Sequence, residues 1–228
     1  VNNTSFPEWF ARRVGQRYAN TWHGTPWKYM GLDIKEDSFS YKNTARNLLQ
    51  ATDIFLPNEH TRESLVDKQD IAGLLRSPVH IVGSPRIDLT IKNIKNAAEI
   101  KERMGVRSDS ICVLYAPTWR GKVGAVAPDI ASFVGAVQEL ARRDVEVLVR
   151  IHHFVEQALQ NLELPVNVTI VPASIDTNEL LAATDVLVTD YSSILFDYVP
   201  LERPIVKFAF DYESYLQERG LYFDLDEV

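Results

Sequence analysis

The chain has very little cysteine and no long apolar run. Among its 228 residues there is one cysteine, Cys112, so no intramolecular disulfide framework can form. Cys112 lies in the apolar run ICVLYAP, which predicts a buried, unreactive thiol and suits a reducing compartment. No segment approaches the roughly 18 to 20 consecutive apolar residues that a membrane-spanning helix needs. A membrane role would therefore be peripheral.

The chain also lacks an excess of basic residues. Its formal net charge is -7 and its pI is near 5.3. A surface that binds nucleic acid normally shows a basic excess, so wholesale binding of nucleic acid is excluded, although a local basic cleft is still allowed. The first residues, VNNTSFPEWF, do not form a signal peptide because no charged start precedes an apolar block. They resemble the middle of a protein, and we expect the fold to be incomplete at both ends.

What the sequence does contain is an alternation of short apolar runs with longer amphipathic segments. The hydrophobic fraction of 46% and the mean hydropathy of -0.14 are typical of a globular protein with a real core. Strands are expected at residues 51–56, 79–83, 110–117, 145–151, 166–171, 185–190 and 204–210. Helices are expected at residues 58–68, 94–105, 129–143, 176–184 and 192–199. Strands rich in valine, isoleucine and leucine without alternation predict an α/β fold whose parallel sheet is covered on both faces.

A domain boundary is expected near residues 90–108, which are polar and highly charged. A new set of strands begins after residue 110, which favours two Rossmann-like lobes with a cleft between them. We therefore predict an amino-terminal lobe, residues 1–95, and a carboxyl-terminal lobe, residues 96–228. The alternative is a single domain in which the charged segment is an ordinary crossover helix.

Polar residues follow several of the expected strands, and open α/β sheets bind ligands at the carboxyl edge of their strands. In YAPTWRG, Thr118 and Arg120 follow the strand at residues 110–117, and Arg120 is placed to point its guanidinium into the cleft. In VLVRIHHF, the alternation of a strand puts Arg150 and His152 on one face and His153 on the other. Adjacent histidines on opposite faces do not share a metal, and we predict no metal site. The plainer alternative for Arg120 is a solvated arginine in a surface loop.

The run DVLVTDYSSILFDYV is the most informative of these strand ends. A buried strand ends at Thr189 and Asp190, and Ser192 and Ser193 begin an amphipathic helix. Hydroxyl groups and unsatisfied backbone N–H groups at a helix amino end favour phosphate. A pyrophosphate can bind there without a glycine-rich motif. A simple serine N-cap is the alternative, but it explains only one of the two serines.

Four motifs, in order, resemble the CDP-glycerol glycerophosphotransferase family of teichoic acid and capsule polyol-phosphate polymerases. They are NNTSFPEWFARRVGQRYANTWHGTPWKYMG, YAPTWRG, RIHH and TDYSSILFDYVPLERPIVKFAFDYESYLQERGLYFD. The resemblance spans nearly the whole chain, and TWHGTP and TDYSS are its most specific parts. It implies a GT-B fold, a CDP-activated polyol as donor substrate, no separate cofactor, and action at the cytoplasmic face of the membrane. Whether a divalent metal assists is open.

The resemblance also suggests roles for individual residues. His23 would be the general base that takes the proton of an acceptor hydroxyl, held by a turn that contains Gly24 and Thr25. Lys28 would contact an anionic polymer or lipid-linked acceptor. The opposite lobe would stabilise the phosphates and the departing CMP, with His152 as electrostatic stabiliser or acid. The residues expected there are Thr118, Arg120, Arg150, His152, Thr189, Asp190, Ser192 and Ser193, of which Thr189 and Asp190 would shape the turn.

This chain departs from the family pattern after HGTP, where Trp27, Lys28 and Tyr29 follow, at Gly121 after TWR, and at His153. These departures leave the acceptor and the polyol open, with glycerol phosphate as the expected unit. Two other classes remain. One is a GT-B glycosyltransferase or epimerase that uses a nucleotide sugar, and the other is a non-catalytic module that binds a lipid carrier. A test of which donor protects the protein from thermal unfolding separates the first alternative from a CDP-polyol enzyme. A test for CMP release separates the second alternative from any such enzyme.

Overall fold

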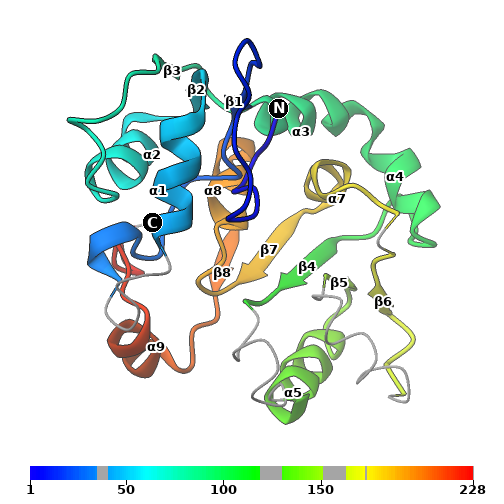
Figure 1. The fold of residues 1–228 in the computed structure, drawn as a ribbon. Helices are drawn as coiled ribbons and strands as arrows, with labels where there is room; N and C mark the ends of the chain where they lie inside the picture. The colour runs from blue at the N-terminus through cyan, green and yellow to red at the C-terminus, as the bar shows by residue number, and fades with distance from the viewer. Residues whose placement is uncertain (35–40, 119–129, 151–162, 173, 228) are drawn as a thin grey trace. The chain divides into compact units, whose positions relative to one another are not determined.

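The computed structural model describes residues 1–34, 41–118, 130–150, 163–172 and 174–227. The chain forms two compact units, which are described separately (Figure 1). Unit 1 contains residues 1–84 together with residues 210–228, and unit 2 contains residues 85–209. The division expected from the sequence, between residues 95 and 96, differs from these bounds. The first helix after residue 84 belongs to unit 2, and the last segment of the chain returns to unit 1.

Unit 1 is built on a parallel three-stranded sheet in the order β1-β2-β3. Its core is apolar: Leu48, Ile54, Leu56 and Leu65 are at most 1% exposed. The elements of this unit are β1 (Ala19–Asn20), a 3-10 turn (Gly31–Asp33), α1 (Tyr41–Gln50), β2 (Asp53–Leu56), α2 (Glu59–Arg62), a π-helical turn (Glu63–Asp67), β3 (Val79–Ile81) and α9 (Tyr212–Glu218).

Unit 2 is built on a parallel five-stranded sheet in the order β6-β5-β4-β7-β8. Its strands are β4 (Cys112–Ala116), β5 (Glu146–Val149), β6 (Val168–Ile170), β7 (Val186–Thr189) and β8 (Ile205–Lys207). Its helices are α3 (Pro85–Asn93), a 3-10 turn (Ile94–Asn96), α4 (Ala97–Arg103), α5 (Ile130–Ala141), α7 (Thr177–Ala183), α8 (Ile194–Tyr198) and a 3-10 turn (Val199–Leu201).

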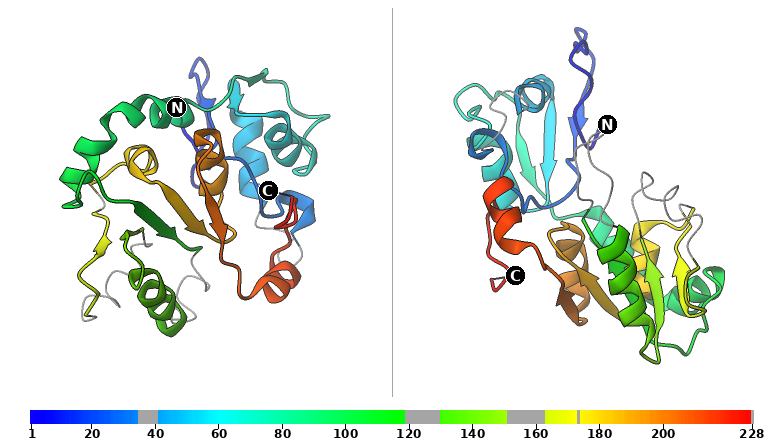
Figure 2. Two further views of the ribbon diagram at one scale, coloured as in Figure 1. Left: turned by 180° about the vertical axis from the view of Figure 1, so that it is seen from behind. Right: turned by 90° about the horizontal axis from the view of Figure 1, so that it is seen from below.

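Alternate residues of the central strands of unit 2 enter two separate cores. Leu114, Leu148 and Leu187 belong to the core beneath α4, α7 and α8, whereas Val113 and Val147 belong to the core beneath α5 (Figure 2). Because successive side chains of a strand point to opposite faces, a strand without alternating polarity requires cover on both faces. The predicted α/β fold with parallel sheets is confirmed. All seven expected strands are present, each shorter than expected by one or more residues at its ends.

Residues 210–228 return to unit 1 through backbone and aromatic contacts. The indole Nε1–H of Trp27 donates to the carbonyl of Phe223 at 2.8 Å, and the N–H of Tyr222 donates to the carbonyl of Trp27 at 2.8 Å. The N–H of Tyr29 donates to the carbonyl of Gly220 at 3.3 Å. Trp27 is only 1% exposed, so this return covers one of the largest side chains of the unit.

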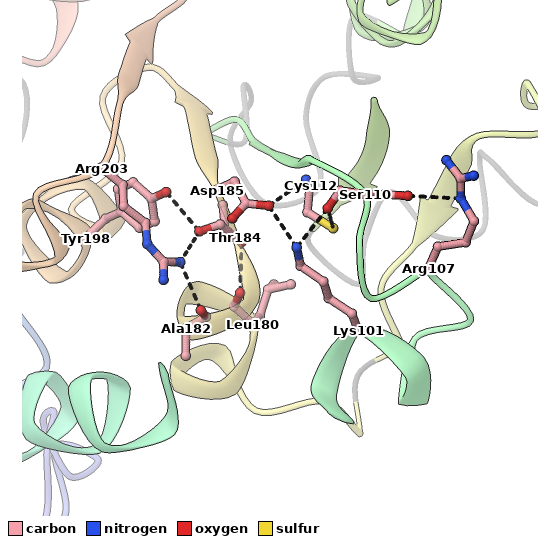
Figure 3. Close-up of polar contacts among 10 residues, drawn as sticks. All are labelled: Lys101, Arg107, Ser110, Cys112, Leu180, Ala182, Thr184, Asp185, Tyr198 and Arg203. Carbon is pink, nitrogen blue, oxygen red and sulfur yellow. Dashed lines mark hydrogen bonds and ion pairs between the residues drawn. The ribbon is translucent and has the colours of Figure 1, made fainter. Parts of the chain in front are cut away.

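The amino ends of β4 and β7 are joined by a buried polar cluster (Figure 3). The ammonium of Lys101, which is 7% exposed as a residue, donates to the carbonyl of Ser110 and to Asp185 Oδ2, both at 2.8 Å. The same carboxylate oxygen accepts the N–H of Cys112 at 2.9 Å. Cys112 is buried, as expected, and burial raises the pKa of its thiol to about 11, which favours the protonated form near neutral pH.

Arg203 and Tyr198 extend this polar edge on the other side of Thr184 (Figure 3). The guanidinium of Arg203 donates to the carbonyls of Ala182 and Thr184, and the hydroxyl of Tyr198 donates to the carbonyl of Thr184 at 3.1 Å. These bonds satisfy carbonyls at the end of α7. They lie at the amino edge of the sheet, and the carboxyl edge is the one that binds ligands in this class of fold.

Candidate active site

The strand order of unit 2 contains a switch point. In sequence order the strands β4 to β8 are arranged 3-2-1-4-5, so the order reverses between β4 and β7. Open α/β sheets bind ligands at the carboxyl ends of the two strands at such a switch point. Thr118 follows β4 and Asp190 follows β7, and the N–H of Thr118 donates to Asp190 Oδ1 at 2.8 Å.

Thr189 and Asp190 are committed to the backbone at this switch point. Thr189 is 0% exposed, and its hydroxyl donates to the carbonyl of Ala116 at 2.7 Å. Asp190 is 2% exposed, and its Oδ1 also accepts the N–H of Tyr191 at 2.6 Å. These bonds tie the end of β7 to the end of β4. Both side chains therefore fix the backbone at the end of β7.

Ser192 and Ser193 precede α8, as expected, but the helix is short. It contains only Ile194–Tyr198 before a 3-10 turn, so its dipole is smaller than that of the expected helix. Ser192 is half-buried, and its hydroxyl oxygen accepts the N–H of Ile194 at a long 3.4 Å. Ser193 occupies the N-cap position and is exposed, and its side chain makes no capping hydrogen bond. The hydroxyl of Ser193 is therefore presented to solvent.

The orientation of α8 is held by a pair of charged residues. Arg86, at the start of α3, donates from Nη2 to Asp197 Oδ1 at 3.0 Å, and Asp197 lies on α8. Burial raises the pKa of Asp197, and the positive charge of Arg86 opposes this shift in part. The pair connects α8 to the first helix of unit 2.

Arg150 follows β5, and its guanidinium donates from Nη1 to the carbonyl of Pro172 at 3.0 Å. This bond directs at least part of the guanidinium toward the segment after β6. Arg120 and His152, which the sequence predicts as phosphate-stabilising residues, lie outside the described residues. Among the residues that are described, no group of three or more His, Cys, Asp or Glu side chains is arranged to hold a metal ion.

In unit 1, His23 follows β1, the first strand of the sheet, and is exposed. The backbone around it is unusual: Trp22 has φ +51° and Gly24 has φ +145°. Trp22 is held in the left-handed region by its N–H, which donates to Asn20 Oδ1 at 2.9 Å. The centre of its ring lies 4.3 Å from the centre of the His23 imidazole. Positive φ at a residue other than glycine is costly and recurs at functional sites.

The tautomer of His23 follows from its hydrogen bond. Nδ1 lies 2.8 Å from the carbonyl oxygen of Asn3. A carbonyl oxygen accepts and never donates, so Nδ1 carries the proton in this contact. In the neutral imidazole, Nε2 then has a free lone pair, and the ring orientation is fixed by the protein. This is the arrangement that a general base requires.

The turn after His23 is held by side chains from the carboxyl end of β2. Asn58, the N-cap of α2, accepts the N–H of Thr61 and donates from Nδ2 to the hydroxyl oxygen of Thr25 at 3.1 Å. His60 Nε2 donates to the carbonyl of Pro26 at 2.7 Å. Sequence reasoning missed Asn58. The signal was present, because Asn58 stands immediately after an apolar strand, where parallel sheets place functional side chains.

Lys28 is turned toward the returning segment of the chain. Its ammonium lies 5.8 Å from the centre of the Tyr215 ring, a cation–π distance, and its backbone pairs with Leu221. The sequence alone did not indicate this partner, since Tyr215 is distant in the chain.

Two units with parallel sheets, one of which has the strand order and switch point of a nucleotide-binding fold, define a protein of the GT-B class. A profile of the family described as CDP-Glycerol:Poly(glycerophosphate) glycerophosphotransferase matches residues 1–228. The chain belongs to this family, which confirms the resemblance seen in its motifs.

Several relatives match over nearly all of this chain. It is 30% identical to a teichoic acid glycerol-phosphate transferase of Staphylococcus aureus, with 97% of this chain and 60% of the relative covered. It is 29% identical to a teichoic acid poly(glycerol phosphate) polymerase of Bacillus spizizenii, with 100% and 60% covered. The chain therefore spans about 60% of the length of these relatives.

The chain also superposes on solved structures of this kind of enzyme. A variant of the wall teichoic acid polymerase TagF superposes with a TM-score of 0.80 at 26% identity, covering 99% of this chain and 57% of that one. A second structure of TagF, of a variant soaked with CDPG, superposes with a TM-score of 0.77. A UDP-GlcNAc 2-epimerase from Methanocaldococcus jannaschii superposes at 0.54 with 15% identity, which reflects the fold alone.

Proposed function

We propose that this chain carries the catalytic region of an enzyme that transfers a polyol phosphate, most simply glycerol phosphate, from a CDP-activated donor to a polymer hydroxyl. The family supports this proposal, as do relatives whose names specify glycerol phosphate transfer and polymerisation. The structure of a TagF variant soaked with CDPG supports the donor. The observation in this chain that carries the proposal is the fixed tautomer of His23, whose Nε2 is available to accept a proton.

The reaction is a displacement at phosphorus. An acceptor hydroxyl oxygen attacks the β-phosphorus of the donor and forms a new phosphodiester bond. The bond between the β-phosphorus and the bridging oxygen breaks, and that oxygen leaves on the α-phosphate as CMP. The hydroxyl proton passes to His23 Nε2. A hydroxyl is a poor nucleophile, so removing its proton as the bond forms lowers the barrier. This typically raises the rate by a factor of about 10² to 10⁴.

On the acceptor side, the turn at Gly24 and Thr25 would leave room for the acceptor beside His23. Thr25 accepts a hydrogen bond from Asn58, so its own hydroxyl proton is directed elsewhere and can be donated to an anionic oxygen. Lys28 contributes positive charge near this turn and would attract an anionic polymer or lipid-linked acceptor.

On the donor side, Ser192 and Ser193 would bind the diphosphate at the switch point, with Thr118 and the turn residues Thr189 and Asp190 beneath them. Arg120, Arg150 and His152 would offset the charge that develops on the phosphoryl oxygens and on CMP. These roles need no protein-bound cofactor. Whether a divalent metal accompanies the diphosphate is a separate question that metal titration of the activity answers.

An enzyme with this chemistry would act where a polymer on a lipid carrier meets a cytoplasmic nucleotide donor, at the inner face of the membrane. None of the helices in the described part of the chain is long and apolar enough to span a membrane.

A donor screen that reads out CMP tests the proposal. The protein in its natural full-length form is mixed with a primed acceptor and with CDP-glycerol, CDP-ribitol or a UDP-sugar. We expect CMP release with a CDP-polyol, and we expect the same donor to raise the melting temperature. Protection by UDP-sugars alone would support a sugar-nucleotide enzyme, and donor binding without CMP release would support a binding module.

A further inference from the structure

The loop that precedes β1 exposes apolar side chains beside arginines. This loop, residues 7–17, is named the arginine loop below. It contains three arginines and one glutamate in a chain whose net charge is -7. Trp9 is 83% exposed and Val14 is fully exposed. In Figures 1 and 2 this part of the chain, dark blue, projects as a narrow loop beyond the rest of unit 1.

Two tight turns present these apolar side chains. The N–H of Phe10 donates to the carbonyl of Pro7 at 2.9 Å, which closes a turn with Trp9 near its tip. The N–H of Gln16 donates to the carbonyl of Arg13 at 3.1 Å, which closes a second turn with Val14 and Gly15 at its tip. Gly15 has φ +78°, the conformation that the third position of a type II turn requires.

The arginine loop is fastened to α1 by hydrogen bonds. The guanidinium of Arg46 donates to the carbonyls of Pro7 and Phe10. The side chain of Gln50 accepts the N–H of Arg12 at 2.8 Å. These bonds hold the two turns in place while their tips remain in solvent.

Phe6 and Phe10 anchor the base of the loop in the core of unit 1. Their rings are stacked with centres 4.2 Å apart, and both lie against Tyr18. Asn47, which is 0% exposed, fixes Phe6 by accepting its N–H at 2.8 Å. Two aromatic residues of this segment therefore point inward, and the third, Trp9, points outward.

We propose that the arginine loop docks unit 1 on an anionic lipid surface. Tryptophan is favoured at the interface between lipid headgroups and hydrocarbon, where its ring is half in an apolar phase. Arginines beside it are attracted to anionic headgroups, each by about 1 kcal/mol. Arg12 and Arg13 have no acidic partner among the described residues, whereas Arg17 pairs with Asp53 at 2.8 Å. Arg12 and Arg13 thus supply the charge, and Trp9 and Val14 supply the apolar contact.

A soluble polyanion is a poorer match for the arginine loop. Such a polymer would satisfy the arginines but would offer no apolar phase in which to bury Trp9 and Val14. A lipid interface satisfies both. This inference concerns binding alone and does not depend on the proposed reaction.

Vesicle sedimentation tests the inference with the protein in its natural full-length form. We expect binding to vesicles that contain phosphatidylglycerol, weaker binding to phosphatidylcholine vesicles, and a decline with salt. Trp9→Ala should lower partitioning about tenfold. Arg12→Gln and Arg13→Gln should each lower it about fivefold, the factor that corresponds to about 1 kcal/mol. CMP release from a soluble donor and acceptor should not change.

Two matched controls come from elsewhere in unit 1. Leu74 is 65% exposed and Arg76 is exposed, so Leu74→Ser and Arg76→Gln remove an apolar and a basic group outside the loop. Both variants should bind vesicles like the natural protein. The inference is overturned if the natural protein ignores anionic vesicles, or if the loop variants bind as well as the controls. It is also overturned if Trp9→Ala instead disperses an oligomer in sedimentation velocity, which would make the loop a contact between copies.

Discussion

Thr118 and Asp190 are separated by 72 positions in the sequence and are joined by a 2.8 Å hydrogen bond at the point where the strand order of unit 2 reverses. The carboxylate oxygen that accepts this bond also accepts the N–H of Tyr191. One buried oxygen therefore holds the backbone after β4 and the backbone after β7 together at the switch point.

Asp190→Ala should lower the free energy of unfolding by about 2 kcal/mol, because it leaves the buried N–H of Tyr191 and the half-buried N–H of Thr118 without this acceptor. Asp190→Asn retains an oxygen in the same position and should recover most of that loss. Urea denaturation of both variants measures the difference. Equal stability of the two variants would mean that the carboxylate oxygen does not hold the turns.

His23→Ala should reduce CMP release by a factor of about 10² or more, because the acceptor hydroxyl loses its base. Donor binding, read as the rise in melting temperature with CDP-glycerol, should be nearly unchanged. His80→Ala is the control, since His80 is a half-buried histidine on β3 of the same unit, and this variant should release CMP at the normal rate. Normal turnover in the His23 variant would eliminate the assignment of the base.

Ser193→Ala should weaken donor binding about tenfold, because a hydrogen bond to a charged phosphate is worth about 1.5 kcal/mol or more. Its hydroxyl makes no capping bond in the structure, so stability should change little. Isothermal titration with CDP-glycerol gives the affinity, and Ser214→Ala, an exposed serine on α9, is the matched control. Arg120→Ala should weaken the donor in the same way. Unchanged affinity in both variants would place the diphosphate elsewhere.

The stability of the Asp197→Asn variant relative to the natural protein should increase as pH rises. Burial raises the pKa of Asp197 above its ordinary value near 3.8, so the folded state holds the proton more tightly than the unfolded state. The natural protein therefore loses stability from this group as pH rises from the unfolded pKa through the folded one, and the asparagine variant does not. Urea midpoints between about pH 4 and pH 8 measure the difference. A difference that shrinks as pH rises would show instead that the charged pair with Arg86 stabilises the fold.

Gly220→Ala should destabilise unit 1 more than Gly15→Ala does. Both glycines have positive φ, which costs an alanine about 1 kcal/mol. At Gly15 an added Cβ meets nothing, whereas at Gly220 it would lie 2.1 Å from Cδ2 of Tyr29. We expect a total cost of about 3 kcal/mol at Gly220 because the ring must also shift. Equal melting temperatures for the two variants would show that the Tyr29 ring moves freely.

The strands β2 to β8 and the positions of their polar ends were predictable from the sequence, whereas the short strand β1 was not among the expected strands. Buried strands such as Val186–Thr189 are continuous apolar runs, and Ser192 and Ser193 follow at helix-capping positions, so local pattern was sufficient. The helix Tyr41–Gln50 was missed because polar residues dominate it and only its inner face, including Asn47 and Leu48, is buried.

The supports of the site were not predictable in the same way. The proton position on His23 depends on a backbone carbonyl, that of Asn3, and a carbonyl carries no sequence signal. The return of residues 210–228 depends on contacts of Trp27 with Phe223, nearly two hundred positions away. Periodicity reports the face of an element and says nothing about such distant partners.

The division of the chain into units has a consequence for biosynthesis. Unit 2 is continuous, so it can fold as soon as residues 85–209 have left the ribosome. Unit 1 is not continuous. Trp27 and Tyr29 gain their final contacts only when residues 220–223 have been synthesised. The early half of unit 1 must therefore wait, with these aromatic side chains uncovered, until the whole of its neighbour has been synthesised.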